Sequence, residues 1–530
     1  MKRVLKSMLA ALALGGLLAA GTALAQEAPR RGGMLVVGST QQTRVLNAAL
    51  QSGPATVIPS AQLFASLVRF DAGHDREPQP YLASAWKWAD DHRSITFTLR
   101  EGAVFHDGQP ITSEDVAFSI MAVKANTSLY AMLDSIERVD TPDPLTAVVH
   151  LSRPNPALLY ALSPALAPIM PKHIYATEKP TDLRTHPRNT KDVVGSGPFM
   201  LERFVPGKEL LLKRFDKFFI EGRPYLDKVL LQTSADPTTL MLSVPRGDVH
   251  LFPFIASRNA ARPVEASKAV TILEQGYAGA APLHWLELNT ARKPFDDRRV
   301  RQAIAYAIDK KFIVQAMYGG WGKPAIGPLS SSSPFAVATN EYPLDLDRAR
   351  TLLDEAGLKP DGNGVRFKMT VDVMVAGQAD RILGQYAQSQ LKKIGIDAQL
   401  RISPDFPTWA QRMAAHDFDM STDQSWTWVD PAIGVNRTYL SSNIQPVVWT
   451  NNASYKNPQV DHLLEQASAE LDPAKRKALY QEFQQIVTED SPLVYVAEIA
   501  YHTVASTRVG NPPTGLFGML APLDEVWLKP

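Results

Sequence analysis

The residue types best suited to hold a small molecule lie together in the segment Asp-Gln-Ser-Trp-Thr-Trp-Val-Asp-Pro, residues 423–431. Its two tryptophans offer large flat rings with one N–H donor each, and its two aspartates can orient a cationic or hydroxylated group. The alternative is that each tryptophan packs in the protein core. We expect five residues of this segment to contact a small molecule: Asp423, Trp426, Thr427, Trp428 and Asp430.

Two other regions carry candidate binding residues. Gln42 and Arg44 follow a predicted strand over residues 34–37, and the carboxyl end of such a strand opens into the cleft of an α/β lobe. Arg44 is suited to clamp a carboxylate through two parallel hydrogen bonds, although an ordinary surface arginine fits the sequence equally well. Tyr277 precedes another predicted strand and is our third candidate. Residues on one face of that strand either line a cleft or pack beside it: Trp285, Glu287 and Asn289.

Three patterns resemble catalytic or metal sites but lack the partners that such sites need. Ser84-x-x-Lys87 has the spacing of a penicillin-recognising nucleophile, yet no Lys-Thr-Gly partner is present. Residues 195–199, Gly-Ser-Gly-Pro-Phe, are not the Gly-x-Ser-x-Gly elbow of hydrolases, and a tight turn explains them better. Residues 416–419, His-Asp-Phe-Asp, are more simply a solvated surface turn than a metal site. We therefore expect no catalytic residue, no metal and no bound cofactor.

The elements that must position these residues form an α/β pattern, because short strand-like runs alternate with helical patterns along the chain. Apolar and polar residues alternate over residues 94–100, which predicts a half-buried strand. One helix is expected to begin after Asp297, a second runs from about Asp347 to Gly357, and a third begins at Pro473.

The amino-terminal segment and the composition constrain the location of the protein. Residues 1–25 have a basic start, an apolar stretch and a final Ala-Leu-Ala, which predicts a cleaved secretory signal. The chain has no cysteine, which excludes disulfides, thiolate metal sites and a lipidated cysteine anchor. The formal charge is +1, and loss of the three basic residues of the signal makes it −2, a balance that favours neither nucleic acid nor an anionic membrane.

Several blocks together resemble the large peptide/nickel family of ABC-importer binding proteins. They run in the order that is expected for this family and cover nearly the whole chain beyond the signal. The strongest is Pro-Tyr-Leu-Ala-Ser-Ala-Trp at residues 80–86, continued by Thr-Phe-Thr-Leu-Arg-Glu-Gly-Ala-Val-Phe-His-Asp-Gly at residues 96–108 and Thr-Ser-Glu-Asp-Val at residues 112–116. Later blocks are Gly-Ser-Gly-Pro-Phe at 195–199, Asp-Arg-Arg-Val-Arg-Gln-Ala-Ile-Ala-Tyr-Ala-Ile-Asp at 297–309 and Leu-Asp-Glu-Ala-Gly at 353–357.

The resemblance implies a two-lobed periplasmic-binding-protein fold of type II, in the large peptide-binding class, with an inserted extra domain. We expect a base lobe from residues 26–58, 196–280 and 497–530, an inserted domain at 59–195, and a second lobe at 281–496. It further implies a monomer, free in the periplasm, that closes around a small solute and delivers it to the permease subunits of an ABC importer in the inner membrane. An exported hydrolase on the same scaffold and a ligand sensor for a receptor are the alternatives.

One departure from the family bears on the solute. Peptide-binding relatives carry an aspartate three residues before the Asp-Pro pair, where it meets the amino terminus of the peptide, whereas this chain has Thr427. A hydroxyl group cannot supply that charge, although Asp423 or Asp430 could substitute. The solute is therefore expected to be a peptide or a non-peptide such as an opine, a sugar derivative or an organic acid.

Overall fold

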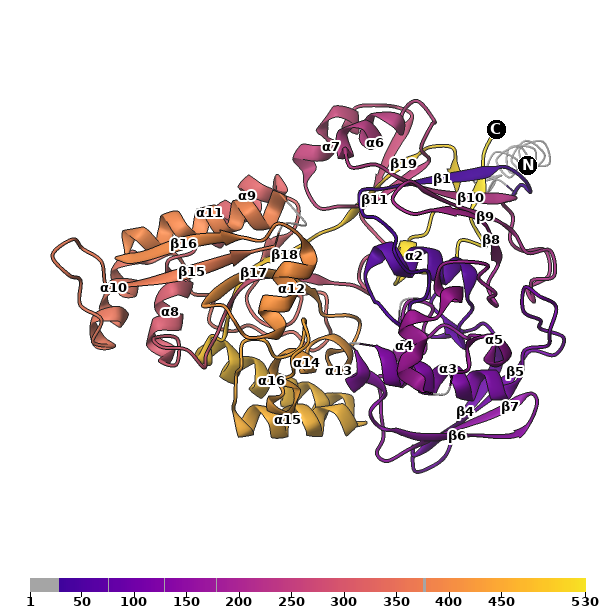
Figure 1. Ribbon diagram of the computed structural model, residues 1–530, viewed down its shortest axis with the longest axis horizontal. Coiled ribbons are helices and arrows are strands. Elements are labelled where there is room, and N and C mark those ends of the chain that lie inside the picture. Colours follow the sequence, from indigo (N-terminus) through magenta and orange to yellow (C-terminus); the bar gives the residue numbers. More distant parts are fainter. Residues whose placement is uncertain (1–27, 75, 128, 178, 375–377) are drawn as a thin grey trace, which may run out of the picture.

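The protein consists of two lobes joined side by side in the computed structural model, which describes residues 28–530 apart from 75, 128, 178 and 375–377 (Figure 1). The predicted signal, residues 1–25, lies outside the described residues. Among the residues that are described, no helix is both long and apolar enough to cross a bilayer. The lobe that contains the amino-terminal half of the described chain is built on a seven-stranded sheet, and the other lobe is built on a six-stranded sheet.

The seven-stranded sheet, called here the base sheet, combines three distant parts of the chain. Its strand order is β12-β19-β11-β1-β10-β9-β8, and β1 pairs in parallel with β10 and β11 while the outer pairs are antiparallel. The strands are β1 (Met34–Ser39), β8 (Phe199–Val205), β9 (Glu209–Arg214), β10 (Lys228–Thr233), β11 (Leu251–Ile255), β12 (Val270–Leu273) and β19 (His502–Ser506). Helices α6 (Pro237–Ser243) and α7 (Arg258–Glu265) pack beside it.

A four-stranded antiparallel sheet lies below the base sheet in Figure 1 and forms the inserted domain. Its order is β4-β5-β7-β6, with β4 (Ala83–Trp88), β5 (Ser94–Leu99), β6 (Ile136–Asp143) and β7 (Thr146–Leu151). The helices around it are α3 (Ser113–Asn126), α4 (Leu158–Ala161) and α5 (Lys172–Tyr175), with the 3₁₀ turns η1 (Tyr130–Leu133), η2 (Pro180–Thr185) and η3 (Pro187–Asn189). Helix α2 (Pro54–Leu63) instead contacts β8 of the base sheet. Residues of the base sheet and of this domain share one continuous apolar core, so the two together form one lobe.

The six-stranded sheet of the second lobe is mixed and is covered by helices on both faces. Its order is β14-β18-β13-β17-β15-β16, where β13 (Pro282–Leu288) is antiparallel to β17 (Met420–Trp426) and β18 (Leu493–Glu498), and β15 (Phe367–Val373) is parallel to β16 (Ile396–Ile402). The edge strand β14 is Lys323–Pro324. Every residue of β13 is buried because Leu286 faces the apolar cluster of helices on one side of the sheet, while Leu283 faces the cluster on the other side.

The helices of the second lobe fill the connections between its strands. They are α8 (Arg298–Tyr306), α9 (Lys310–Tyr318), α10 (Leu346–Glu355), α11 (Gln378–Lys393), α12 (Phe406–Ala414), α13 (Pro431–Gly434), α14 (Asn436–Tyr439), α15 (Pro458–Ala469) and α16 (Pro473–Asp490), with η4 (Ser441–Asn443). Short pairs complete the chain: β2 (Val68–Arg69) with β3 (Gln79–Pro80), β20 (Val509–Gly510) with β21 (Trp527–Leu528), and the turn η5 (Gly518–Leu520). The chain passes between the lobes at residues 274–281 and 499–501.

Local sequence signals predicted several elements correctly. The strand over residues 94–100 is β5, whose alternate residues are buried. Asp297 caps α8 by accepting a hydrogen bond from the Arg299 amide at 2.8 Å. Gly357 has a φ of 79° just beyond α10, as the terminating conformation requires. The helix predicted to begin after Asp297 ends at Tyr306, because Asp309 caps a new helix, α9.

Candidate functional site

The two lobes meet along residues 426–443 of the second lobe, which we call the interlobe segment. It starts next to the first chain passage, where the Thr427 hydroxyl donates a hydrogen bond to the Ala281 carbonyl at 2.8 Å. The Trp428 amide donates to the Ala280 carbonyl at 3.2 Å. From this hinge side the segment continues through α13, α14 and η4 to the outer edge of the junction. Thr427 is therefore held to the hinge backbone.

Trp426 forms an aromatic wall between the lobes. Its ring is parallel to that of Phe254 in the base sheet, with centroids 6.0 Å apart and an interplanar angle of 4°. The Phe254 ring also meets the edges of Tyr277 and Tyr501, one from each chain passage. Trp426 keeps part of its surface exposed, so its indole can contact a bound molecule while it remains supported from the other lobe.

Tyr277 lies at the chain passage as part of the support for this wall. Its hydroxyl accepts a hydrogen bond from the Phe254 amide at 3.0 Å and lies 2.5 Å from the hydroxyl of Thr503. Burial raises the pKa of Tyr277 to about 12, so the hydroxyl stays neutral and able to donate. The side chain is buried beneath Phe254 and Tyr501 in this arrangement.

Trp428 and the residues after it are buried against the first lobe. Trp428 packs near Phe517, and Val429 and Ile433 belong to the apolar core that the base sheet shares with the inserted domain. A Cβ on Gly434 would stand 2.5 Å from the Thr427 carbonyl oxygen, so only glycine allows the chain to turn this closely. The structure thus uses this part of the predicted binding segment as an interlobe contact.

Asp430 is engaged in a buried ion pair. Its carboxylate oxygens accept hydrogen bonds from both terminal nitrogens of Arg476, at 2.6 and 2.8 Å, and one of them also caps α13 through the Ala432 amide at 2.9 Å. The Arg476 guanidinium lies over the ring of Phe335 at 5.0 Å. Both carboxylate oxygens are therefore occupied within the second lobe.

Asp423 lies deeper in the second lobe, beneath Trp449. Its carboxylate accepts the Trp449 indole N–H at 3.3 Å and the Gln424 amide at 2.7 Å. Burial raises the pKa of Asp423 to about 8, and burial together with the negative charge of Asp423 raises the pKa of Glu287 as well. The buried Arg437 guanidinium lies close enough to favour the charged form of Asp423 and donates to the Ser425 hydroxyl at 2.8 Å. Trp449, which donates to this carboxylate, is only partly buried.

Arg44 and Gln42 are both exposed on the first lobe, but only Arg44 lies near a charged residue of the other lobe. Hydrogen bonds from Thr408 lower the pKa of Asp405, at the start of α12, and the positive charge of Arg44 from the opposite lobe lowers it further. Arg44 and Asp405 are thus charges of opposite sign on opposite lobes. Gln42 instead lies beside Gly207, in the turn between β8 and β9.

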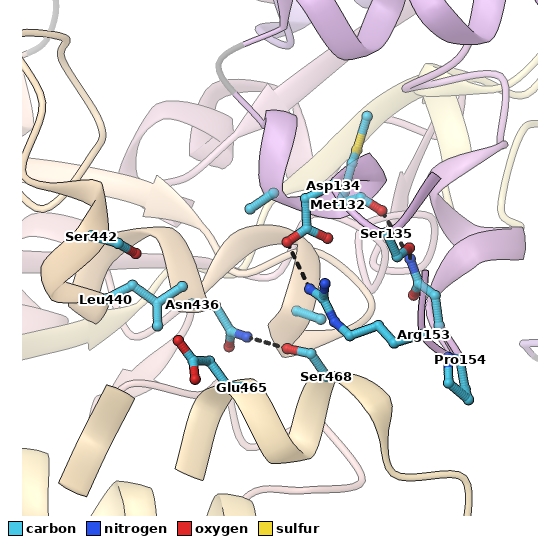
Figure 2. Close-up of a pocket in the computed structure, with 13 residues that line it drawn as sticks. Met132, Asp134, Ser135, Arg153, Pro154, Asn436, Leu440, Ser442, Glu465 and Ser468 are labelled. Atoms are coloured by element: carbon cyan, nitrogen blue, oxygen red, sulfur yellow. Dashed lines mark hydrogen bonds and ion pairs between the residues drawn. The ribbon is translucent and has the colours of Figure 1, made fainter. Parts of the chain in front are cut away.

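The outer part of the junction contains a polar cavity of about 320 Å³ with walls from both lobes (Figure 2). On the first-lobe wall, Arg153 and Asp134 form an ion pair at 2.7 Å. On the second-lobe wall, the Asn436 amide donates to the Ser468 hydroxyl at 2.9 Å, and Glu465 lies beside them. Such a space can receive polar groups of a molecule that contacts both lobes. No sequence pattern predicted this cavity, because its residues come from segments far apart in the chain.

The residues with catalytic or metal-binding spacing have structural partners instead. The Ser84 hydroxyl donates to the Thr98 carbonyl across two strands at 3.1 Å. The Ser196 hydroxyl donates to the Ile169 carbonyl at 2.7 Å, while the flanking glycines allow close contact with the end of α2, where a Cβ on Gly195 would stand 1.9 Å from the Leu63 carbonyl oxygen. The glycines therefore serve close packing. Within the described part of the chain, no group of three or more His, Asp or Glu residues is arranged to hold a metal ion.

Comparison with known proteins identifies relatives across most of the chain. Residues 77–446 match the family described as bacterial extracellular solute-binding proteins, family 5, middle region. The oligopeptide-binding protein AppA of Bacillus subtilis (strain 168) is 26% identical over 489 residues, which cover 88% of this chain and 86% of AppA. The glutathione-binding protein GsiB of Salmonella paratyphi A is 27% identical over 441 residues, covering 80% of this chain and 81% of GsiB.

Solved structures resemble the whole fold. The structure of Bacillus subtilis AppA in complex with a nonapeptide superimposes with a TM-score of 0.83 at 24% identity, covering 95% of this chain and 100% of that one. The structure of AgaA from A. tumefacien R10 in complex with agropinic acid gives a TM-score of 0.79 at 24% identity, covering 94% of this chain and 99% of that one. The two-lobed architecture predicted from the sequence is thereby confirmed.

Proposed function

Because the chain belongs to family 5 of the bacterial extracellular solute-binding proteins, we propose that it captures a small organic solute between its two lobes and delivers it to an ABC importer. The observation that carries this proposal is the junction itself, where both lobes contribute an aromatic wall, opposite charges and a polar cavity. A molecule that touches both walls binds the closed arrangement better than the open one and shifts the population toward it.

In this proposal the predicted binding residues divide into two groups. Trp426 and Arg44 contact the solute directly, because both keep exposed surface at the junction. Asp423 contacts it only when Trp449 moves aside, and Gln42 only at the edge of the junction. The remaining predicted residues support the site from behind: Tyr277, Thr427, Trp428 and Asp430.

The solute that suits this arrangement is an organic acid or another non-peptide with a carboxylate. The Thr427 hydroxyl is bonded to the Ala281 carbonyl and offers no charge to an amino terminus, whereas Arg44 offers a cation to a carboxylate. Two relatives are named for an oligopeptide and for glutathione, and the structure of AgaA is a complex with agropinic acid. Peptides therefore remain the second candidate class.

In this proposal the protein makes and breaks no covalent bonds. It is a monomer in the periplasm after removal of residues 1–25, and its protein partners are permease subunits of the inner membrane. Ser84 and Ser196, whose spacing resembles that of catalytic serines, support the absence of catalysis, because each hydroxyl donates a hydrogen bond to a backbone carbonyl. Screening the purified protein with ester, amide and glycoside chromogens tests this directly. Sustained turnover of any of them would favour an exported hydrolase.

Identification of the bound solute tests the central proposal. Native mass spectrometry of gently purified protein is expected to detect a small organic molecule. Calorimetry with that molecule should give a dissociation constant at least tenfold larger for Trp426→Ala and for Arg44→Ala than for the unmodified protein. Arg262→Ala is the matched control, because Arg262 is an exposed arginine on α7. Unchanged affinity in both junction variants would remove this wall from the site. Loss of uptake of the same solute after gene deletion separates import from sensing.

A further inference from the structure

The inserted domain reaches across the junction and holds the second lobe through two side chains that the solute site does not use. One terminal nitrogen of Arg76 donates to the Ser332 carbonyl at 2.8 Å, and the other donates to the Val429 carbonyl at 3.3 Å. The Tyr130 hydroxyl donates to Oδ1 of Asn443 at 2.7 Å. We call these three hydrogen bonds the clasp.

The acceptors of the clasp are fixed within the second lobe. The Asn443 amide nitrogen donates to the Arg437 carbonyl, which turns its oxygen toward Tyr130. The loop that carries Ser332 is held by Glu498, whose carboxylate accepts from the Ser331 amide at 3.0 Å and from the Ser330 hydroxyl at 3.1 Å. Fixed acceptors lose little freedom when the donors arrive, so the hydrogen bonds favour one relative position of the lobes.

The clasp differs in chemistry from a surface ion pair. Arg76 is partly buried, and the two oxygens that it contacts are backbone carbonyls from segments almost a hundred residues apart in the chain. A charged donor to a neutral acceptor gives a stronger hydrogen bond than a neutral pair does. Its geometry exists only while Ser332 and Val429 both lie against the loop that carries Arg76, so separation of the lobes breaks it.

We infer that the inserted domain acts as a clasp for the closed state, with Arg76 and Tyr130 as positioning residues that hold the second lobe whatever the solute is. This inference rests on the proposed capture of a solute by lobe closure. Because the clasp adds the same stabilisation for every solute, its loss should weaken the binding of all solutes by a common factor and should raise the open population without any solute.

The open population can be measured with a single thiol, because the chain contains no cysteine. Ile433→Cys places a thiol where the second lobe is buried against the core of the first lobe, so it reacts when the lobes separate. Ala303→Cys places a thiol in the core of the second lobe alone, so it reacts only on unfolding. When closing is fast, the rate of reaction with a thiol reagent is proportional to the open fraction, however small that fraction is.

In the solute-free protein, Arg76→Ala is expected to raise the reaction rate at position 433 about tenfold, and Tyr130→Phe about threefold, with no change at position 303. Arg188→Ala is the matched control and should change neither rate, because Arg188 donates to the Asp192 carbonyl at 2.8 Å within the inserted domain. Equal acceleration at both positions would mean general destabilisation and would overturn the inference, as would no acceleration at position 433.

These outcomes are distinct from a failure of the proposed function. The thiol experiment uses no solute, so it gives the same answer whether or not a natural solute is found. Once a solute is known, we expect Arg76→Ala to weaken the binding of two chemically different solutes by the same factor. Weakening of only one of them would make Arg76 a solute contact instead.

Discussion

The hinge side of the interlobe junction is held by apolar contacts, whereas the outer side is held by polar ones. On the hinge side, Trp428 is buried in the core of the other lobe and packs near Phe517. On the outer side, the lobes meet through the hydrogen bond from Tyr130 to Asn443 and leave a polar cavity of about 320 Å³. Water can replace a hydrogen bond to a polar group at small net cost, whereas exposure of apolar surface costs about 25 cal/mol per Å². The outer side is therefore the part that can open, and the hinge side is the part that stays together.

The largest expected effect is on the hinge side. Trp428→Ala removes a buried ring that packs near Phe517 and should lower the free energy of unfolding by about 3–5 kcal/mol. Urea unfolding followed by circular dichroism measures it. If Trp428 contributed mainly to solute binding, the loss of stability would be under about 1 kcal/mol and only the affinity would fall.

The buried ion pair of the interlobe segment comes next. Asp430→Ala leaves Arg476 without its carboxylate in a buried position and should cost about 3 kcal/mol of unfolding free energy. Asp405→Ala is the control, since this exposed residue caps α12 and its loss should cost about 1 kcal/mol. Equal effects in chemical denaturation would contradict the distinction between a buried pair and an exposed cap.

The pH dependence of stability tests the buried carboxyl near the junction. In the folded protein Asp423 holds its proton up to a pKa of about 8, whereas an ordinary unfolded aspartate releases it near pH 4. Unfolding therefore releases a proton between about pH 4 and pH 8, and this residue makes stability fall as the pH rises through that window. Asp423→Asn should make the unfolding midpoint less dependent on pH there. An unchanged slope would mean that the carboxyl is ionised in the folded protein.

The smallest effect is expected on the outer side. Tyr130→Phe removes one hydrogen bond to Asn443 at a place where water can replace it, so the free energy of unfolding should fall by less than about 1 kcal/mol. The comparison with Trp428→Ala in the same urea experiment sharpens the contrast between the two sides. A loss as large as that of Trp428→Ala would show that the outer side is part of the permanent contact.

Sequence reasoning succeeded where a feature depends on a few neighbouring residues, or where several sequence blocks follow the order found in a known family. The alternating burial of β5 and the cap at Asp297 follow from a few neighbouring residues, and the family was correctly identified from its ordered blocks. Sequence reasoning could not separate the roles of neighbouring residues in the binding segment. Trp426 keeps exposed surface while Trp428, two positions later, is buried, because the chain takes a φ of 56° at Trp428 and turns that ring to the other lobe.

The sequence by itself determined the fold class and the family, because these depend on periodicity and on the order of motifs. Only the tertiary structure decided which partner each residue meets: Arg476 for Asp430, the Ala281 carbonyl for Thr427, and the Ser332 and Val429 carbonyls for Arg76. All four of these partners lie more than 40 positions away in the chain. Contacts between distant segments depend on how whole lobes pack, and no local pattern of residues records that packing.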